Sequence, residues 1–484
     1  MKVKVAVVGT GVAGLQTLRE ILREGHSAKA FEISDDIGGV WRQNYVGASL
    51  QGDKASWALP EFPWPQGSDL TAYPPRAEVQ AYLRAYASHF DLLKHISFNT
   101  AVTGLRRSEA TGKWTVTCKK AGLGSASEEF DWVAVCTGSA CYPRLPAWAK
   151  QPQGYQGTII HSRQCTDTSI AAGKHVLVIG GGKSALDAAE NASKVARQTT
   201  LLARTAHWAI PRFLLHVVPQ NIPFFSRLGA ALWEPYYTAS RLHTLIFAIL
   251  RPMIMLLWMG LASLVRLQLG TSGHARPKRT FAKDMLGFDG MSTDGTFYKL
   301  CRSGKIAYEV GEVASLNHDG ITTKDGQTIK ADLIICATGF NRDDAKLLGE
   351  KERAALDLRE DGSWLYREML PANLPGIAFI GASTVLSMAL FTAVQAKWLA
   401  AVMSGRLQLP SPAEMEHDVA ALRKWKRRVY TASPQRATHI HLHLQAYLDQ
   451  VMGDLGVNPK RKSNALLEWL DPILPADYRQ LFIS

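Results

Sequence analysis

The sequence has few cysteines and lacks the patterns that mark several common protein classes. Six cysteines are scattered through 484 residues, so we expect no disulfide framework, and reduced thiols as in a cytoplasmic protein. No clustered basic helix, RNA-binding aromatic motif or zinc-finger spacing is present, which argues against nucleic acid binding. An apolar strand pattern begins almost at once, at Val3, and leaves no room for a cleavable signal peptide.

The bulk composition is that of a soluble globular protein. With 46% hydrophobic and 20% charged residues over 484 positions, the chain can bury a large core and should form two or three domains. The formal net charge is +13. A basic surface suits anionic partners, such as a phosphorylated cofactor or an anionic membrane face.

Two glycine-rich segments stand far apart in the chain. The first is Gly9-Thr10-Gly11-Val12-Ala13-Gly14 and the second is Gly180-Gly181-Gly182-Lys183-Ser184-Ala185. Each follows a run of apolar, β-branched residues and opens onto a helical pattern. One such segment is weak evidence, but two in a strand–turn–helix context predict two dinucleotide-binding sites. A protein with two such sites usually holds one cofactor permanently and takes its reductant at the other, as a flavoenzyme does.

The two segments differ in the residue that ends the next strand. Glu32 lies 21 residues after Gly11, where a carboxylate can accept hydrogen bonds from ribose hydroxyls, and this predicts an FAD site. Arg204 lies 22 residues after Gly182. A guanidinium there can hold a 2′-phosphate with paired donors, so the second site should prefer NADPH to NADH.

Two further strands end in Thr-Gly and predict where each nucleotide-binding half closes. They are Trp132 to Gly138 and Leu333 to Gly339. We therefore predict an α/β protein with two Rossmann-like dinucleotide-binding domains. Residues 1–168 and 340–484 form the FAD domain in this prediction, and residues 169–339 form the NADPH domain.

The NADPH domain should carry a mainly helical insertion over about residues 206–300. It includes a nearly continuous apolar stretch, Leu245 to Leu264, that is long enough to span a membrane. Both flanks must join one sheet, so a single span is excluded. A buried core helix, a segment lying in the membrane interface and a re-entrant pair remain open. The positive charge and the apolar neighbour Phe213 to Trp233 favour peripheral membrane contact through residues 213–264.

Several motifs together resemble the flavin-containing monooxygenases, a class B flavoprotein monooxygenase family related to the Baeyer–Villiger monooxygenases. Tyr155 to Arg163 is similar to the FxGxxxHSR fingerprint, with Tyr in place of Phe. Gly38 to Arg42 resembles GGLWR, and Phe90 to Ile96 resembles FDLLKxI. Cys336 to Phe340 resembles ATGY. Gln395 to Trp398 resembles QARW, and Pro475 to Leu481 resembles PxxYRxL. The resemblance covers nearly the whole chain and is weakest in the insertion.

The resemblance implies an NADPH- and O2-dependent cycle. FAD is reduced by NADPH and captures O2 as a C4a-hydroperoxide, which oxygenates a soft nucleophilic nitrogen or sulfur of a small molecule. Baeyer–Villiger oxygenation of a ketone is the alternative within the same group. An NADPH-dependent flavin disulfide reductase and a non-catalytic nucleotide-binding protein are the alternatives from other classes. The sequence does not define the oligomeric state.

The motifs and the resemblance together give the expected site residues. Counting from Glu61 to Pro65 back through Lys54 places the active-site Asn of the family at Gln51, the candidate catalytic residue. The expected FAD-binding residues are Gly9, Gly11, Val12, Ala13, Gly14, Glu32, Gly39, Val40, Trp41, Leu50, Gln51, Val102, Thr137, Gly138 and Gly381. The expected NADPH-binding residues are Gly180, Gly182, Lys183, Ser184, Ala185, Arg204, Thr338 and Gly339.

Two other patterns are discounted. Cys136 and Cys141 have the spacing of a redox dithiol but follow a Thr-Gly strand and not the first FAD helix, which argues against a disulfide reductase. His439, His441 and His443 alternate as metal ligands on a strand would. Their surroundings read as helical, however, and we expect no metal site.

Overall fold

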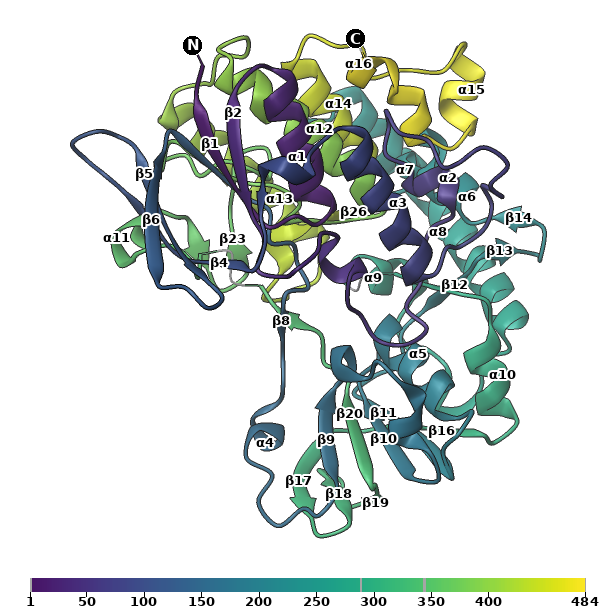
Figure 1. The fold of residues 1–484 in the computed structure, drawn as a ribbon. Coiled ribbons are helices and arrows are strands. Elements are labelled where there is room, and N and C mark those ends of the chain that lie inside the picture. The colour runs from purple at the N-terminus through teal and green to yellow at the C-terminus, as the bar shows by residue number, and fades with distance from the viewer. Residues whose placement is uncertain (1, 288–289, 343–344, 484) are drawn as a thin grey trace.

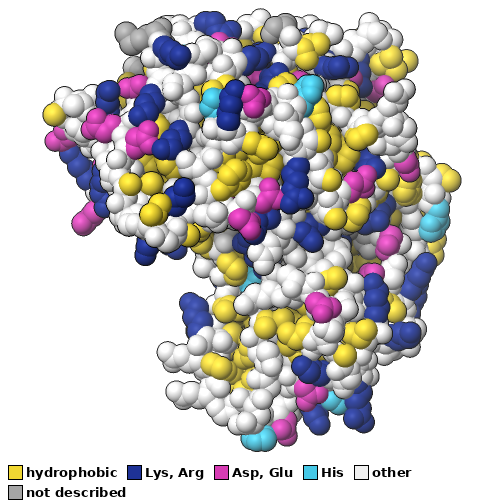
Figure 2. All heavy atoms as spheres, in the orientation of Figure 1, with side chains coloured by type: hydrophobic (Ala, Val, Ile, Leu, Met, Phe, Trp, Pro, Cys, Tyr) yellow, Lys and Arg dark blue, Asp and Glu magenta, His cyan; other side chains and the backbone are white. Residues whose placement is uncertain are grey.

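The chain folds into two α/β lobes joined by a pair of crossing segments (Figure 1). The computed structural model describes residues 2–287, 290–342 and 345–483. Both chain ends lie on the first lobe (Figure 1). In Figure 2 the surface is hollowed between the lobes, and Lys and Arg side chains are spread over both of them, consistent with the basic composition.

The first lobe is built on a five-stranded parallel sheet. The strand order is β24 (Ile377–Phe379), β7 (Trp132–Val135), β1 (Lys4–Val8), β2 (Ser27–Phe31) and β3 (Ile96–Ser97). Helix α1 (Val12–Arg23) follows β1 and packs against α12 (Met388–Met403). Both faces are covered, so the central strand carries an unbroken apolar run.

The second lobe repeats this plan. Its parallel sheet has the order β16 (Ile306–Val310), β11 (Gln198–Ala203), β10 (His175–Ile179), β20 (Leu333–Cys336) and β9 (Thr158–His161). Helix α5 (Lys183–Ala192) follows β10 and packs against α10 (Thr296–Arg302). The expected architecture of two Rossmann-like domains is confirmed.

The crossing between the lobes differs from the expected boundary. Strand β8 (Tyr142–Pro143) pairs antiparallel with β21 (Phe340–Asn341) where the chain leaves and re-enters the first lobe. The expected first domain extended to residue 168, but β9 pairs with β20 in the second sheet. The forward crossing therefore lies near β8. The fingerprint segment from Tyr155 to Arg163 belongs to the second lobe.

Smaller elements complete the lobes. The first lobe adds the antiparallel sheet β4 (Thr100–Arg107), β5 (Trp114–Lys120) and β6 (Ser125–Phe130) and the helix α3 (Arg76–His89). Its C-terminal part adds α13 (Pro412–Val429), β26 (His439–His441), α14 (Leu444–Asp454) and α15 (Ala465–Leu470). The second lobe adds β17 (Val313–Asn317), β18 (Gly320–Thr323) and β19 (Thr328–Lys330).

The insertion between β11 and β16 is mainly helical, as expected. It contains α6 (Asn221–Phe225), α7 (Arg227–Ala231), α8 (Arg241–Leu269) and α9 (Phe281–Met285). Two short strands, β12 (Ala209–Pro211) and β15 (Met291–Thr293), pair in parallel at its base. Both flanks return to one sheet, because β11 pairs with β16.

Helix α8 is long, apolar and exposed. It runs unbroken for 29 residues, with Ser240 capping its N-terminus and Gly270 ending it in the left-handed conformation. By length and composition alone it could cross a membrane. Only 17% of its most apolar window is buried inside the protein, whereas a core helix would be mostly buried. The core-helix alternative is therefore wrong because the apolar side chains face outward. The re-entrant pair is wrong because the helix is continuous.

Candidate functional site

The first glycine segment forms a tight turn between β1 and α1 that admits only glycine at two positions. Gly9 has a φ of +95°, and a Cβ there would lie 2.9 Å from the carbonyl oxygen of Cys136. A Cβ on Gly14 would lie 1.9 Å from the carbonyl oxygen of Gly9. These two glycines are required by the packing of strand against helix, as the motif predicts.

Gly11 has a different reason to be glycine. Its φ of −70° suits any residue, and an added Cβ would meet only the Cα of Gly39, at the ordinary contact distance of 3.7 Å. Gly11 thus keeps open a space in front of the first turn of α1. That turn has no side-chain cap and no acidic residue. Its free N–H groups suit a diphosphate, so this cradle fits a dinucleotide.

Glu32 lies buried directly beyond β2, beside the same turn. Its Oε2 accepts hydrogen bonds from the Thr10 backbone N–H at 2.9 Å and from the Thr10 hydroxyl at 2.7 Å, and its Oε1 accepts from the Ser34 N–H at 3.0 Å. These bonds fix the carboxylate at the end of the strand, where the predicted ribose contact requires it.

Most of the other expected FAD-binding residues surround this cradle. A Cβ on Gly381, just after β24, would approach the Cβ of Ala13 to 2.9 Å, so this turn meets the start of α1. The Thr100 N–H donates to the Glu32 carbonyl at 2.8 Å, so the start of β4 lies beside Glu32. Val102 follows two residues later on the same strand. Leu50 is buried. The remaining positions lie on the 3₁₀ turn Gly39–Trp41, at the start of α1 and at the exit of β7: Val40, Trp41, Val12, Thr137 and Gly138.

The second glycine segment forms an equivalent turn between β10 and α5. Gly180 has a φ of +142°, and a Cβ there would lie 2.3 Å from the Ala337 carbonyl oxygen. Gly182 is the N-cap of α5 and supplies no side chain, so the N–H groups of Lys183 and Ser184 head an uncapped helix. Ala185 is fully buried and its N–H donates to the Gly182 carbonyl at 2.9 Å. Ala185 therefore packs the helix and has no free N–H for a ligand.

Two cations flank this second turn. Arg204 follows β11 directly and is exposed. Its side chain has no hydrogen bond or ion pair within residues 2–287, 290–342 and 345–483. The Lys183 ammonium instead pairs with Asp187 one turn along α5. Arg204 thus presents a guanidinium without a hydrogen bond or ion pair where the sequence predicts the 2′-phosphate contact, with only the charge of Glu312 nearby. Lys183 would have to leave Asp187 to reach a phosphate.

An unexpected hydrogen bond ties the first lobe to α5. The Tyr45 hydroxyl donates to Asp187 at 2.9 Å, and Asn191 donates to the Val46 carbonyl at 3.0 Å. Burial, with the nearby Asp187 carboxylate, raises the pKa of Tyr45 well above its usual value, so the phenol stays protonated. These contacts could not be predicted from the sequence because they join segments more than a hundred positions apart.

Gln51 lies where the insertion meets the first lobe. Its side-chain Oε1 accepts from the Ser292 N–H at 3.1 Å, and its backbone carbonyl accepts from the Gln220 side chain at 2.7 Å. The Asn221 side chain donates to Asp53 at 2.7 Å. The insertion therefore fixes the Gln51 loop from two directions, which the family motif alone does not predict.

The second Thr-Gly exit is tied to the interlobe crossing. Arg144 beside β8 donates its N–H to the Gly339 carbonyl at 3.0 Å and its Nε to the Thr338 carbonyl at 2.9 Å. A ring nitrogen of His161 also lies 2.9 Å from the Gly339 carbonyl oxygen. Burial lowers the pKa of His161. These contacts place the fingerprint histidine in the interlobe joint.

The discounted motifs form no site among the described residues. Cys136 and Cys141 are not joined by a disulfide, and the Cys141 thiol donates to the Gly138 carbonyl at 3.6 Å. Burial raises the pKa of Cys136 to about 12, which makes it unreactive. His439 and His441 lie on a strand, β26, which was not expected, whereas His443 caps the N-terminus of α14, the helix expected in the surroundings. Nδ1 of His443 meets the Tyr430 hydroxyl at 2.6 Å, and no metal-binding cluster occurs in the described chain.

Comparisons with known proteins agree with this geometry. The family model described as "FMO-like: Flavin-binding monooxygenase-like" matches residues 2–242 and 297–477. The chain is 30% identical to "Probable flavin-containing monooxygenase 1" of Arabidopsis thaliana, over 98% of this chain and 96% of the relative. The unmatched residues, 243–296, contain almost all of α8 and the whole of α9.

Two solved structures share the fold at low sequence identity. The S-allyl-L-cysteine S-oxygenase of Allium sativum is similar with a TM-score of 0.65 and 20% identity, over 95% of this chain and 89% of that one. A cyclohexanone-bound cyclohexanone monooxygenase is similar with a TM-score of 0.70 and 19% identity, over 94% of this chain and 97% of that one.

Proposed function

The chain belongs to the flavin-binding monooxygenase-like family, and on that premise we propose that it uses NADPH and O2 to oxygenate a nitrogen or sulfur atom of a small molecule. The membership confirms the expected enzyme class and a flavin cofactor. A steroid monooxygenase bound to NADP and a structure with FAD and NADP share the fold, which supports FAD and NADP as the cofactors of this chain. Bound FAD supplies the redox chemistry, because it takes hydride from NADPH and activates O2.

The observation that carries the proposal is the difference between the two nucleotide turns. The first ends at a buried carboxylate, Glu32, which suits a ribose with free hydroxyls. The second ends at the unpaired guanidinium of Arg204, which suits a 2′-phosphate. Two turns with these opposite endings support one permanent FAD and one exchangeable NADPH.

The residues between the lobes would orient the cofactors and exclude water. Gln51 and Asp53 are bonded to the insertion through Gln220 and Asn221, so the insertion closes over the loop that carries the expected active-site carboxamide. Desolvation by burial raises the pKa of Asp53. A dry, fixed environment of this kind protects a reactive oxygenating species from hydrolysis.

The substrate class is tested by product analysis. An amine, a thioether and a ketone are each incubated with the FAD-loaded protein, and NADPH consumption is compared with oxygenated product by mass spectrometry. We expect an N-oxide or S-oxide in proportion to NADPH consumed. A lactone or ester from the ketone alone would establish the Baeyer–Villiger alternative, which the likeness to a cyclohexanone monooxygenase supports. NADPH oxidation with peroxide as the only product in all three would contradict the proposal.

We further propose that the enzyme is cytoplasmic and contacts an anionic membrane surface through residues 213–264. Ile249 and Leu256 on α8 are each 67% exposed and lie seven positions apart, so they share a face. The helix carries three arginines and no acidic residue, which complements anionic lipid head groups. A helix that lies in the membrane interface also leaves both ends of the insertion on one side of the membrane, as the pairing of β11 with β16 requires.

Vesicle flotation tests the membrane contact. We expect the protein to float with phosphatidylglycerol vesicles and much less with phosphatidylcholine vesicles. Ile249→Glu with Leu256→Glu should abolish flotation, because both side chains are exposed and the fold does not depend on them. Leu123→Glu, at a 63% exposed position in the β5–β6 turn, is the matched control. Equal flotation of both variants would refute the contact through α8.

A further inference from the structure

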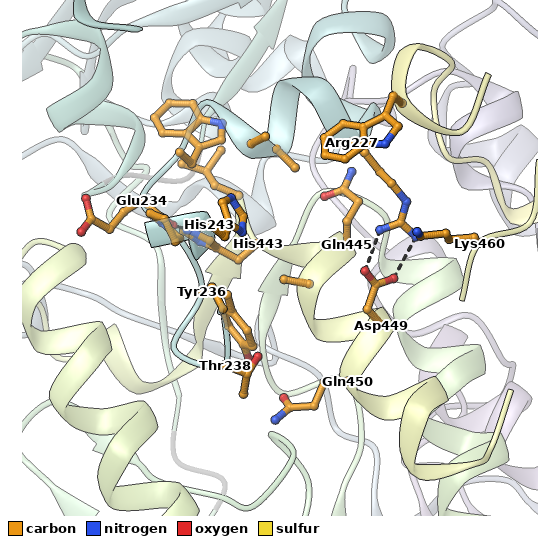
Figure 3. Close-up of a pocket in the computed structure, with 18 residues that line it drawn as sticks. Arg227, Glu234, Tyr236, Thr238, His243, His443, Gln445, Asp449, Gln450 and Lys460 are labelled. Carbon is orange, nitrogen blue, oxygen red and sulfur yellow. Dashed lines mark hydrogen bonds and ion pairs between the residues drawn. The ribbon is translucent and has the colours of Figure 1, made fainter. Parts of the chain in front are cut away.

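A pocket unrelated to the nucleotide turns lies between the insertion and the C-terminal helices. It has a volume of about 460 Å³, within the range of small-molecule sites. One wall comes from α7 and the segment leading to α8, and the other from α14 (Figure 3). None of its lining residues is an expected cofactor-binding residue.

The interior of this pocket is suited to an apolar group. Trp233 and Tyr236 are buried in its wall, and Trp233 packs against Trp258 of α8 at 4.3 Å between ring centroids. Leu442 and Ala231 complete the apolar lining. Such walls bind a hydrocarbon chain through burial of apolar area.

Two of the ionisable groups in the same walls already have partners. Arg227 is paired with Asp449 at 2.6 Å, which Figure 3 shows on one side of the pocket, and also bonds Glu468 at 2.5 Å. His443 is neutral because burial lowers its pKa to about 3, and its Nε2 lies 2.8 Å from the Glu234 carbonyl oxygen. A ligand inside the pocket therefore gains little from polar atoms there.

A second, polar pocket of about 250 Å³ adjoins the first. The two share Lys460 and Trp469. Lys462, Asn458, Asn464 and Ala465 also line the second pocket, together with Glu468, whose carboxylate is paired with Arg227 and accepts from the Lys462 N–H. Among the described residues the Lys460 ammonium has no hydrogen bond or ion pair. A free ammonium between an apolar chamber and an amide-lined chamber provides an anion site at one end of a hydrocarbon site.

The surroundings of the two pockets are themselves apolar. Trp469 is 47% exposed, and its neighbours Leu466 and Leu470 on α15 are exposed as well. Helix α15 packs against α7, where Leu228 is exposed, and the first turn of α8 lines the pocket through His243. A ligand with a long apolar chain can therefore reach the larger pocket over an apolar surface.

We propose that these two joined pockets bind a single-chain amphiphile with an anionic head group. Its hydrocarbon chain lies against Trp233 and Tyr236, and its head group lies at Lys460. The ligand is a free long-chain carboxylate or the acyl chain of an anionic lipid, which share this chemistry. The site is independent of the oxygenation reaction, since it contains none of the nucleotide-binding residues.

Titration with cis-parinaric acid, a fatty acid that fluoresces in apolar surroundings, tests the site on the full FAD-loaded chain. We expect a single saturable site from which oleate displaces the probe. Ala231→Phe fills the larger pocket and should weaken binding by about tenfold or more. Lys460→Glu should weaken it several-fold. Lys330→Glu, an equally exposed lysine at the far end of the second lobe in β19, should leave it unchanged.

Competition distinguishes the two sources of the ligand. Displacement by oleate but not by oleoyl-lysophosphatidylglycerol identifies a fatty acid site, and displacement by both identifies a lipid acyl site. Flavin content and melting temperature verify the fold of each variant, and Lys460→Glu at the surface serves if Ala231→Phe does not fold. Unchanged probe affinity in the folded variants, or no binding to the wild type, would overturn the proposal. Flavin reduction by NADPH is scored separately, so failure of one proposal is distinct from failure of the other.

Discussion

Replacing Arg204 should separate NADPH from NADH more sharply than any other change. The guanidinium is exposed directly beyond β11, and no described residue holds it by a hydrogen bond or ion pair, although the Glu312 carboxylate lies within range of its charge. A hydrogen bond between charged groups contributes about 1.5 to 3 kcal/mol. Its loss in Arg204→Ala should therefore raise the KM for NADPH roughly 10- to 150-fold, with the KM for NADH changed less than about twofold.

Steady-state kinetics with both nucleotides measure this effect, and a matched arginine controls for general charge. Arg197 is exposed just before the opposite end of β11, so Arg197→Ala removes the same charge from the same lobe. It should leave both KM values unchanged. Equal losses for NADPH and NADH in Arg204→Ala, or the same NADPH loss in Arg197→Ala, would refute the assignment of the 2′-phosphate to Arg204.

Three further predictions concern the cradle and the core. Gly11→Ala should fold, because the added Cβ meets only ordinary contacts inside the protein, but it should retain less than about a tenth of the FAD. Gly14→Ala should not fold. The flavin-to-protein absorbance ratio and the melting temperature distinguish the two variants. His443 has its pKa lowered by burial to about 3, from about 6.5 when unfolded, so the stability it confers is present above pH ~6.5 and is lost as the pH falls towards 3. Urea unfolding measures the free energy of unfolding at each pH. Between pH ~7 and ~4 it should fall by about 3 kcal/mol less in His443→Gln than in the wild type, and an equal fall in both proteins would contradict this. Lys426→Met should destabilise by about 3 to 5 kcal/mol because it leaves Glu368 buried without its partner, and adding Glu368→Leu should recover most of that loss; no recovery would refute the pairing.

The nucleotide-binding framework could be predicted from the sequence because it depends on local geometry. Gly9 and Gly180 both have positive φ, and an added Cβ at either position would collide with the carbonyl oxygen of the residue after a neighbouring strand. Only glycine therefore fits at these positions. The acid and the arginine that end β2 and β11 follow from a fixed spacing in the same unit. Local requirements of this kind leave a clear trace in a single sequence.

The contacts between distant segments could not be predicted. The bonds from Gln51 to Gln220 and Ser292 join segments 169 and 241 positions apart, and nothing in either segment indicates its partner. The strand from His439 to His441 was missed because its pairing with β25 (Thr384–Val385) outweighs the helical surroundings. The boundary at residue 168 was misplaced because β9 is a short edge strand whose sheet is decided by its partner β20.

The exposure of α8 is a matter of context that composition alone leaves open. An apolar stretch of this length is equally compatible with a core helix, a membrane segment and a surface helix. The fold decides between them because only Ile254, Ala262, Val265 and Leu269 are fully buried, while most of the other apolar side chains of α8 are exposed.

Anaerobic reduction of the bound flavin tests the central claim most directly, because it requires both nucleotide sites at once and no knowledge of the substrate. NADPH is added to the FAD-loaded protein without oxygen, and the flavin absorbance is followed before and after O2 is admitted. The two-site assignment predicts rapid bleaching by NADPH, much slower bleaching by NADH, and full recovery of the absorbance with O2. The assignment would be contradicted if the protein retained no flavin, or if NADPH failed to bleach the bound flavin.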